Sequence, residues 1–457
     1  MMHYERTGRR HAHTVRTALL VTGLVGGLSG CDVLSTEVEN PNVVGQEDVE
    51  KPAAAAALVS GVMFRTTSAL GELGVAHGTI ADELTWRGSF DNVGALDRGV
   101  LTVHDQLYIE PGYEDLATAR WLGDEAVRIL EGHDANGDLP SRQLLAEAYW
   151  LAGVNYLLAA ENFEEFAVSD RREPGPIVPR GQLFDTGLDY LAQAATTAQS
   201  AGDADLEVRA LAYRARGYWS RALWSKLEPG ATPAQPLIDD SDANALAAAV
   251  LARVPAGWEH AFAFTSSTQQ SRLGFEVNSR REVAVEDHVI EQDASLRQSC
   301  WPENSSCSHD GIRLMDPVDD IQDPALRREA WTFMGSFVYP IQVGVSAREL
   351  NLILAEAALL NDDVLGYTAR INAVRGLESS LTPYNAAIHA GVDRQELLVH
   401  MRRTNLFLQL QRRLLDMYRF GIQAPVWEAT GTAVTAPGTV FPIGKSECNS
   451  NPVVGAC

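Results

Sequence analysis

Apolar residues recur at helical spacing along most of this chain, and this periodicity limits the fold more than any other feature. In the segment 347–360, apolar side chains stand at intervals of three and four residues and line one face of a helix. Similar helical patterning extends over 51–64, 114–132, 141–160, 183–201, 206–226, 363–375 and 394–420. The sequence therefore predicts a mainly α-helical protein.

Several of the predicted helices form pairs joined by short turns, as tetratricopeptide units do. No strict repeat of about 34 residues is present, so we expect tetratricopeptide-like helix pairs in an irregular arrangement. Between residues 227 and 345, prolines and clusters of Ser, Asn and Asp interrupt the helical pattern. Binding residues and short strands are expected in this loop-rich region, for example a strand near 337–343.

The first thirty residues have the pattern of an export signal. Four arginines precede a mostly apolar stretch, 18–28, which at about eleven residues is shorter than the roughly twenty of a membrane-spanning helix. It is followed by the sequence L-S-G-C, which resembles the lipobox of bacterial lipoproteins and ends at Cys31. We predict a signal peptide over 1–30, a mature chain over 31–457 and a lipid on Cys31. The alternative is an ordinary secretory signal with an incidental cysteine.

The chain is strongly acidic, with a formal net charge of −23. The predicted signal carries four arginines and one glutamate, so its removal makes the mature chain more acidic still. Nucleic-acid binding needs basic patches, and adhesion to anionic lipid needs positive charge. The acidic charge therefore argues against both functions. No segment after the signal approaches twenty consecutive apolar residues, the length of a membrane-spanning helix.

Four cysteines remain if Cys31 carries lipid, and they fall into two local pairs. An even number of cysteines in an exported chain predicts disulfides, which we assign as Cys300–Cys307 and Cys448–Cys457. Four cysteines allow three connectivities. A zinc site is disfavoured because the spacings do not match C-x2-C and no histidine pair lies beside them.

Enzyme motifs are absent from the sequence. It has no H-E-x-x-H, no G-x-S-x-G, no P-loop and no G-x-G-x-x-G between a strand and a helix. The many acidic residues make chance pairs of carboxylates certain, and a glycosidase needs two that flank a cleft. We therefore predict a protein without catalytic residues or cofactors.

Two acidic stretches are compared with calcium sites. The stretch 134–138 begins like a calcium-binding loop, but Leu139 and Leu145 stand where that loop has Gly and Glu, which favours a turn between helices. The aspartates of 316–323 are expected to form a solvated acidic loop. No metal site is predicted.

Two tryptophans lie outside the helical patterns. Trp86 stands in a polar, glycine-containing stretch with Asn92, and Trp301 lies beside Cys300. An aromatic face stacks on the apolar C–H surface of a sugar, and amides or carboxylates bind its hydroxyls. Ligand binding is therefore predicted for Trp86, Asn92 and Trp301. Packing in the core is an equally strong alternative for Trp86, and packing on the cysteine pair is the stronger alternative for Trp301.

The chain resembles the RagB/SusD family of nutrient-uptake lipoproteins along nearly all of its mature length. Five segments carry the resemblance: the "-DEL-" segment 77–84, the "aGxxyllxgExF" helix 148–163, the "EaxLilAEA…iNxvR" pair 345–375, the "RlxDxxRfG" helix end 413–421 and the "fPIxxxExxxNP" tail 441–452. Two features depart from the family pattern. Gln411 stands where the family has glycine, and the tail cysteines are not a family feature.

The resemblance implies a SusD-like, lipid-anchored protein exposed at the cell surface on the outer membrane. It implies a partner, a SusC-like TonB-dependent transporter, to which the chain hands a glycan, a peptide or another oligomeric nutrient without altering it. It also places Trp86 and Asn92 in the family's early ligand-binding segment. Asp32, which in some bacteria retains lipoproteins at the inner membrane, leaves the final membrane open.

Two alternatives of different function remain. A lipid-anchored hydrolase would form product, and single Asp or Glu substitutions would abolish its activity. A periplasmic helical scaffold would bind proteins through a concave face and would be protected from protease in intact cells. Copurification with a large barrel protein from the outer membrane would distinguish a substrate-capturing transport subunit from the hydrolase and from the scaffold.

Overall fold

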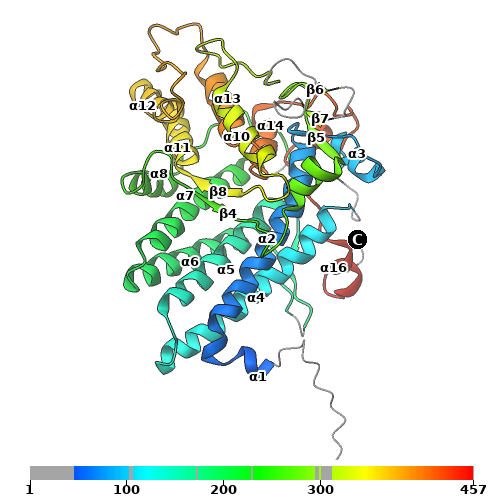
Figure 1. Ribbon diagram of the computed structural model, residues 1–457, viewed down its shortest axis with the longest axis vertical. Helices are drawn as coiled ribbons and strands as arrows, with labels where there is room; N and C mark the ends of the chain where they lie inside the picture. Colours follow the sequence, from blue (N-terminus) through cyan, green and yellow to red (C-terminus); the bar gives the residue numbers. More distant parts are fainter. Residues whose placement is uncertain are drawn as a thin grey trace, which may run out of the picture. The chain divides into compact units, whose positions relative to one another are not determined.

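The computed structural model describes residues 46–101, 106–170, 173–227, 230–293, 298–299 and 311–455, and most of its regular structure is helical (Figure 1). The mainly α fold predicted from the sequence is therefore confirmed. The body that begins at Glu47 forms one compact unit. The predicted boundary between residues 30 and 31, and Cys31 itself, lie outside the described residues.

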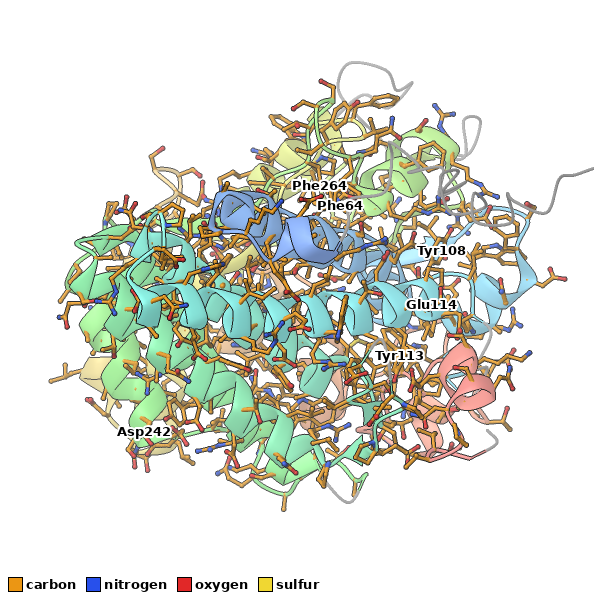
Figure 2. All side chains as sticks on the ribbon, turned by 90° about the horizontal axis from the view of Figure 1, so that it is seen from below. Phe64, Tyr108, Tyr113, Glu114, Asp242 and Phe264 are labelled. Carbon is orange, nitrogen blue, oxygen red and sulfur yellow. The ribbon has the colours of Figure 1, made fainter. Side chains whose placement is uncertain are left out.

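Helices that follow one another in the sequence pack side by side in the first half of the body. They are α2 (Ala55–Ile80), α4 (Ile109–Asn136), α5 (Arg142–Asn162), α6 (Arg180–Ser200), α7 (Ala204–Leu227) and α8 (Ser241–Leu251). Figure 2 shows α2, with Phe64, running alongside α4, whose first turns carry Tyr113 and Glu114. The predicted tetratricopeptide-like helix pairs correspond to this stacked series.

Small residues allow the closest helix crossings in this series. A methyl group on Gly153 of α5 would lie 2.8 Å from the carbonyl oxygen of Gly187 of α6. A methyl group on Gly123 of α4 would lie 3.2 Å from Cα of Ala152. Larger side chains at these points would push the helices apart and open the core, which is packed as densely as an organic crystal.

A second set of helices encloses a smaller core. It consists of α11 (Ala347–Leu360), α12 (Val364–Arg375) and α13 (Arg394–Asn405). Leu352, Tyr367, Ile371 and Met401 are among the buried residues of this core. The buried apolar residues of α10 (Pro324–Gly335) and α14 (Arg412–Phe420) belong to the larger core of the body. The predicted bounds of the helix over 347–360 match α11.

The region between α7 and α11 is rich in loops, as predicted, and holds most of the short strands. The antiparallel pairs are β1 (Leu84–Trp86) with β5 (Val283–Val285), β2 (Phe166–Ala167) with β3 (Ile177–Val178), β4 (Glu259–Phe262) with β8 (Gln342–Ser346), and β6 (Gln292–Asp293) with β7 (Gln298–Ser299). The strand expected near 337–343 overlaps β8 only at its last two residues, because β8 begins at Gln342 and residues 337–341 are not in a strand. Shorter helices are α1 (Gln46–Val49), η1 (Pro52–Ala54), α3 (Asp91–Asp97), α9 (Arg272–Gly274), η2 (Phe275–Arg280), α15 (Thr432–Thr435) and α16 (Lys445–Ser450).

The prediction of one continuous helix over 394–420 is wrong. The chain leaves the helix after Asn405 and re-enters it at Arg412, with Leu408 and Leu410 at φ values of 56° and 58°. Hydrogen bonds to side chains from elsewhere in the chain stabilise the backbone at this break. The Leu408 N–H donates to Glu83 Oε1 at 2.9 Å, and Gln342 Nε2 donates to the Leu408 carbonyl at 2.9 Å. Tertiary hydrogen bonds thus override the local helical pattern.

By length and composition, the segment Pro52–Ile80 is the one described helical stretch that could cross a membrane. In the structure α2 packs against both α4 and α5, and nearly all of its second half is buried. This packing is that of a core helix in a globular body.

Charged residues of the family-like motifs are buried and pair with residues far away in the sequence. Asp82, which precedes β1, accepts hydrogen bonds of 2.8 and 3.0 Å from Arg413 of α14. Glu161 at the end of α5 accepts from Gln411 Nε2 at 2.6 Å and pairs with Arg216. Further buried pairs are Glu349 with Arg412, Glu356 with Arg419, and Asp416 with Arg402 and Arg419. These motif residues hold the fold together.

Gln411, at the position where the family pattern has glycine, lies in the right-handed helical region at φ −67°. A side chain is therefore accommodated there without backbone strain. Its amide adds a hydrogen bond to Glu161 that glycine could not supply.

The two acidic stretches have structural roles. The turn predicted over 134–138 begins only at Gly137, which ends α4 in the left-handed conformation at φ 75°, because residues 134–136 are the last residues of that helix. The prediction of a solvated loop over 316–323 is wrong for Asp316 and Asp323, which are 0% and 1% exposed. Burial is possible because Arg375 donates to Asp316 at 2.6 and 3.1 Å.

Candidate functional site

Trp86 is the last residue of β1 and lies at the edge of the two-stranded sheet that β1 forms with β5. Its side chain is partly buried, and its indole Nε1 donates a hydrogen bond of 3.1 Å to Glu282 Oε1. A methyl group on Gly94 of α3 would lie 2.8 Å from Cε3 of the indole. Glycine at this position therefore lets the ring lie close against α3.

Glu282 fixes the turn that follows Trp86. It is 2% exposed, and its Oε1 also accepts the Ser89 and Phe90 N–H groups at 2.9 and 2.8 Å. Its carbonyl oxygen accepts the N–H groups of the two residues before them. A methyl group on Gly88 would lie 2.1 Å from the Glu282 carboxyl group, so this tight turn requires glycine.

Phe90 adds a second aromatic ring to this edge. The guanidinium carbon of Arg280 lies 4.1 Å from the centre of the Phe90 ring, and Arg280 Nη2 lies 3.7 Å from Glu282 Oε2. Arg87 and Ser89 between the two rings are exposed. The result is a pair of partly buried aromatic rings bordered by exposed polar groups, which we call the Trp86 surface.

Asn92 lies in the first turn of α3, the helix against which the Trp86 ring packs. It is partly buried, and its side chain makes no hydrogen bond with any residue that the structure describes. The structure thus brings Trp86 and Asn92 onto neighbouring elements. Their roles in ligand binding stay predictions.

Several predicted site residues lie outside the described residues. These are Cys31, Cys300, Trp301, Cys307 and Cys457. Cys448 is buried within α16, and its pairing with Cys457 stays a prediction.

The carboxylates around Trp86 shape the backbone. Asp97 Oδ2 accepts hydrogen bonds of 3.1 Å from both Thr85 Oγ1 and the Trp86 N–H, and burial raises the pKa of Asp97. Burial would also raise the pKa of Asp82, but His288 and Arg413 outweigh it and hold that pKa below its usual value. Asp97 and Glu282 therefore hold the backbone of Trp86 and of the turn that follows it.

One described group of side chains has the spacing of metal ligands: Asp316, Asp323 and His400, with ligand atoms within 4.8 Å of one another. Their atoms already have protein partners. Asp316 accepts from Arg375, and Asp323 accepts from His400 at 2.7 Å and caps α10. We interpret the group as a buried ion-pair cluster.

Sequence reasoning found Trp86 but missed Phe90, Arg280 and Glu282. Glu282 lies 196 residues from Trp86 in the sequence and in no recognisable motif. The one local signal was the glycine at position 88, directly before the residues that Glu282 binds. A glycine in a polar turn is too common to identify such a partner.

No family model and no curated protein matches this chain. Solved structures do. A SusD homolog from Bacteroides thetaiotaomicron VPI-5482 is 15% identical with a TM-score of 0.61, and the match covers 90% of this chain and 98% of that one. A SusD superfamily protein from Bacteroides fragilis NCTC 9343 is 12% identical, with a TM-score of 0.59 and coverages of 88% and 98%. One from Parabacteroides distasonis ATCC 8503 is 13% identical, with a TM-score of 0.57 and coverages of 88% and 98%. The resemblance to the SusD fold is therefore confirmed.

Proposed function

We propose that this chain, which has the fold of the SusD superfamily, is a binding protein that captures a glycan or another oligomeric nutrient at the Trp86 surface. It acts without catalysis and passes the ligand to a SusC-like TonB-dependent transporter. The observation that carries the proposal is a partly buried tryptophan, held by its ring nitrogen, next to a second aromatic ring and an exposed polar turn.

Physical chemistry supports this assignment of the surface. The bond from Trp86 to Glu282 and the contact with Gly94 fix the indole before any ligand arrives. A preorganised ring loses little conformational entropy on binding. Its apolar face suits the C–H surface of a sugar, and the exposed polar groups of the turn suit sugar hydroxyls.

The proposal includes a lipid anchor on Cys31 that holds the mature chain at the cell surface of the outer membrane. Several acyl chains anchor a protein much more stably than one, because each buried methylene contributes about 0.8 kcal/mol. An anchored capture protein stays near its transporter without a membrane-spanning segment.

A glycan and peptide array, followed by calorimetric titration, tests the binding function. We expect the wild-type chain to bind an oligosaccharide and Trp86→Ala to weaken that binding at least tenfold. Trp86→Phe retains a ring and should keep most of the affinity. Trp331→Ala, at a tryptophan 38% exposed on α10, is the matched control and should bind normally. Equal affinities of the wild type and the folded Trp86→Ala variant would exclude this surface as the site.

Isolation of the lipidated protein from detergent-solubilised outer membrane tests the partner. We expect a TonB-dependent barrel to copurify with the wild type, and Cys31→Ser to lose membrane partitioning. Copurification with periplasmic proteins alone would instead favour the helical scaffold.

A further inference from the structure

Two arginines at the edge of the Trp86 surface have side chains without a partner. Arg87 directly follows Trp86, and Arg281 directly precedes Glu282. Both arginines are exposed, and neither side chain makes a hydrogen bond, an ion pair or a ring contact with any residue that the structure describes. The guanidinium donors of both residues are therefore available to a ligand.

Hydrogen bonds of the backbone place these two arginines on neighbouring segments of the chain. The N–H groups of Arg87 and Gly88 both donate to the Glu282 carbonyl oxygen, at 3.0 and 2.9 Å. Segments paired in this way run about 4.8 Å apart. Since Arg281 is bonded directly to Glu282, the two arginines start from adjacent positions, and their long side chains can reach one bound molecule.

The backbone that presents Arg281 is unusual. It follows η2, which is wound as a π-helix, and the Arg281 N–H donates to the Glu276 carbonyl oxygen five residues earlier. Arg281 has a φ of 61°, in the left-handed region that few residues other than glycine adopt. Turns of π-helix are frequent at functional sites, and strained backbone persists only where the surroundings enforce it. The fold thus holds an arginine where the local backbone disfavours one.

The exposed charges around the two arginines do not cancel them. Glu276 and Glu282 are already paired with Arg272 and Arg280, at distances of 2.9 to 3.7 Å. Asp91, the first residue of α3, is exposed and lies in the same turn as the Phe90 ring. One exposed carboxylate therefore stands against two unpaired guanidinium groups.

Two buried acids lie behind this edge, Asp97 and Glu286, which are 7% and 6% exposed. Burial raises the pKa values of both, and the nearby Arg87, which lowers them, does not outweigh it. A raised pKa shifts a carboxyl group towards its neutral form. These acids therefore offset less positive charge than two exposed carboxylates would.

Unpaired guanidinium groups beside a fixed indole ring match a sugar that carries negative charge. The planar fork of donors in arginine fits the oxygens of a carboxylate or a sulfate, while the indole face fits the apolar side of the sugar ring. We propose that the ligand of the Trp86 surface is an acidic oligosaccharide, whose carboxylate or sulfate groups bind Arg87 and Arg281. The inference rests on the proposed function, because it names the class of glycan bound at the same surface.

The net charge of −23 does not prevent such binding. At physiological ionic strength, charges more than about 8 Å away are largely screened, so the groups at the surface itself decide which ligand is attracted.

Matched acidic and neutral oligosaccharides test the inference by calorimetric titration. The probes are tetramers of galacturonic acid and of mannuronic acid with their methyl esters, and a sulfated galactan tetramer with its desulfated form. They separate carboxylate from sulfate as the source of charge. We expect at least one acidic tetramer to bind about tenfold more tightly than its neutral form, because two ion pairs contribute. Raising the NaCl concentration from about 50 to about 500 mM should weaken binding of the acidic form only.

Substitutions identify the residues responsible. Arg87→Gln and Arg281→Gln should each weaken binding of the acidic form about threefold to fivefold and leave that of the neutral form unchanged. Asp91→Asn removes a repelling charge and should strengthen binding of the acidic form. Arg128→Gln is the matched control, because it changes the net charge equally at a side chain 60% exposed on α4, and it should bind as the wild type does.

Equal affinities for the acidic and neutral forms, or losses in the two arginine variants no larger than that in Arg128→Gln, would overturn the inference. If those equal affinities fall in Trp86→Ala, the proposed function stands and only the assignment of charge fails. No binding by any oligosaccharide would overturn both. Tighter binding of a peptide of four glutamates than of any acidic tetramer would overturn the inference in favour of acidic peptides.

Discussion

His77 is a titratable residue that the fold keeps neutral. Its side chain is 0% exposed in α2, its Nε2 lies 2.6 Å from Asn162 Oδ1, and its ring centre lies 4.4 Å from that of Phe441. Burial lowers its pKa to about 3, against the bond to Asn162, which raises it. The unfolded chain binds a proton near pH 6.5, so stability falls as the pH drops from 6.5 towards 3.

This linkage predicts the behaviour of His77→Gln. Glutamine keeps an amide donor for Asn162 but does not titrate, so it removes the proton uptake of the unfolded state. We expect the variant to be less stable than the wild type at pH 7, and the gap in unfolding free energy to narrow by about 2 kcal/mol at pH 5. Urea denaturation at both pH values measures this. A constant gap would show that the imidazole takes up its proton at the same pH in the folded protein as in the unfolded chain.

The buried pair of Asp82 and Arg413 should contribute far more to stability than an exposed pair. Removal of one member of a buried pair leaves the other charged and without its partner. We expect Arg413→Ala to lower the unfolding free energy by about 3–5 kcal/mol. In the exposed pair of Asp185 and Arg221, with side chains 62% and 38% exposed, Asp185→Ala should cost less than about 1 kcal/mol. Similar losses in the two variants would contradict a structural role for the first pair.

At the residue scale, the sequence identified the segments that carry the family-like motifs, but it did not predict which residues their side chains contact. The segments around Asp82 and Arg413 were both recognised from the family-like motifs. Their contact could not be predicted, because 331 residues separate them and no local pattern records a long-range ion pair. For the same reason, the anchoring of Trp86 by Glu282 was missed.

At the scale of elements, two glycines should respond in opposite ways to alanine. Gly61 lies within α2, and a methyl group there would meet nothing within 4 Å. Gly421 ends α14 at φ 67°, and a methyl group there would make only an ordinary contact of 3.7 Å with Thr232. We expect Gly61→Ala to raise the unfolding free energy by about 0.5–1 kcal/mol and Gly421→Ala to lower it by about 1–2 kcal/mol. Thermal and urea unfolding would measure both, and changes of equal sign would contradict the helix bounds.

Long helices were the elements most predictable from the sequence, because their apolar faces repeat over several turns. The bounds of α11 matched, whereas α2 extends to Ile80, beyond the alanine-rich pattern that ended at residue 64. The prediction of one helix over 394–420 was wrong because the hydrogen bonds that interrupt this helix involve Glu83 and Gln342, which are distant in the sequence. Local periodicity contains no information about such partners.

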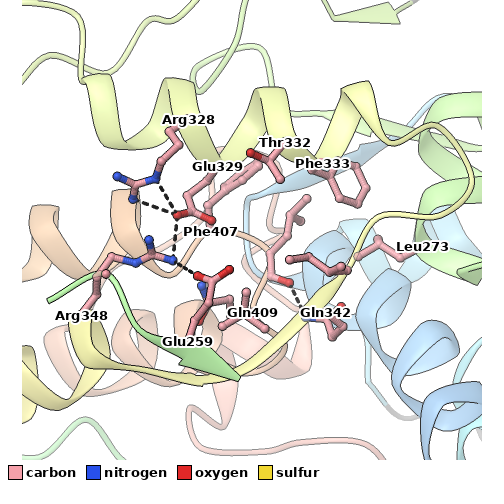
Figure 3. A pocket seen from close by; sticks show the side chains of 14 residues that line it. Glu259, Leu273, Arg328, Glu329, Thr332, Phe333, Gln342, Arg348, Phe407 and Gln409 are labelled. Atoms are coloured by element: carbon pink, nitrogen blue, oxygen red, sulfur yellow. Dashed lines mark hydrogen bonds and ion pairs between the residues drawn. The ribbon is translucent and has the colours of Figure 1, made fainter. Parts of the chain in front are cut away.

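At the scale of the whole molecule, the pocket beside α10 (Figure 3) could not be predicted at all. Its lining comes from α10, from β4 and β8, and from the residues between α13 and α14, which are far apart in the sequence. The stacked helices, by contrast, contact their neighbours in sequence order, so short-range patterns were enough to predict them. The fold class can therefore be predicted from the sequence, whereas the pockets on this fold can be found only in the three-dimensional structure.

The central claim is that this chain binds a glycan and leaves it unchanged. The most direct test incubates the mature chain with the oligosaccharide selected on the array, measures the bound fraction at equilibrium and determines the mass of the recovered ligand. We expect saturable binding and a ligand of unaltered mass after prolonged incubation. Shortened oligosaccharides, formed by the wild type and lost on substitution of a single Asp or Glu, would contradict it.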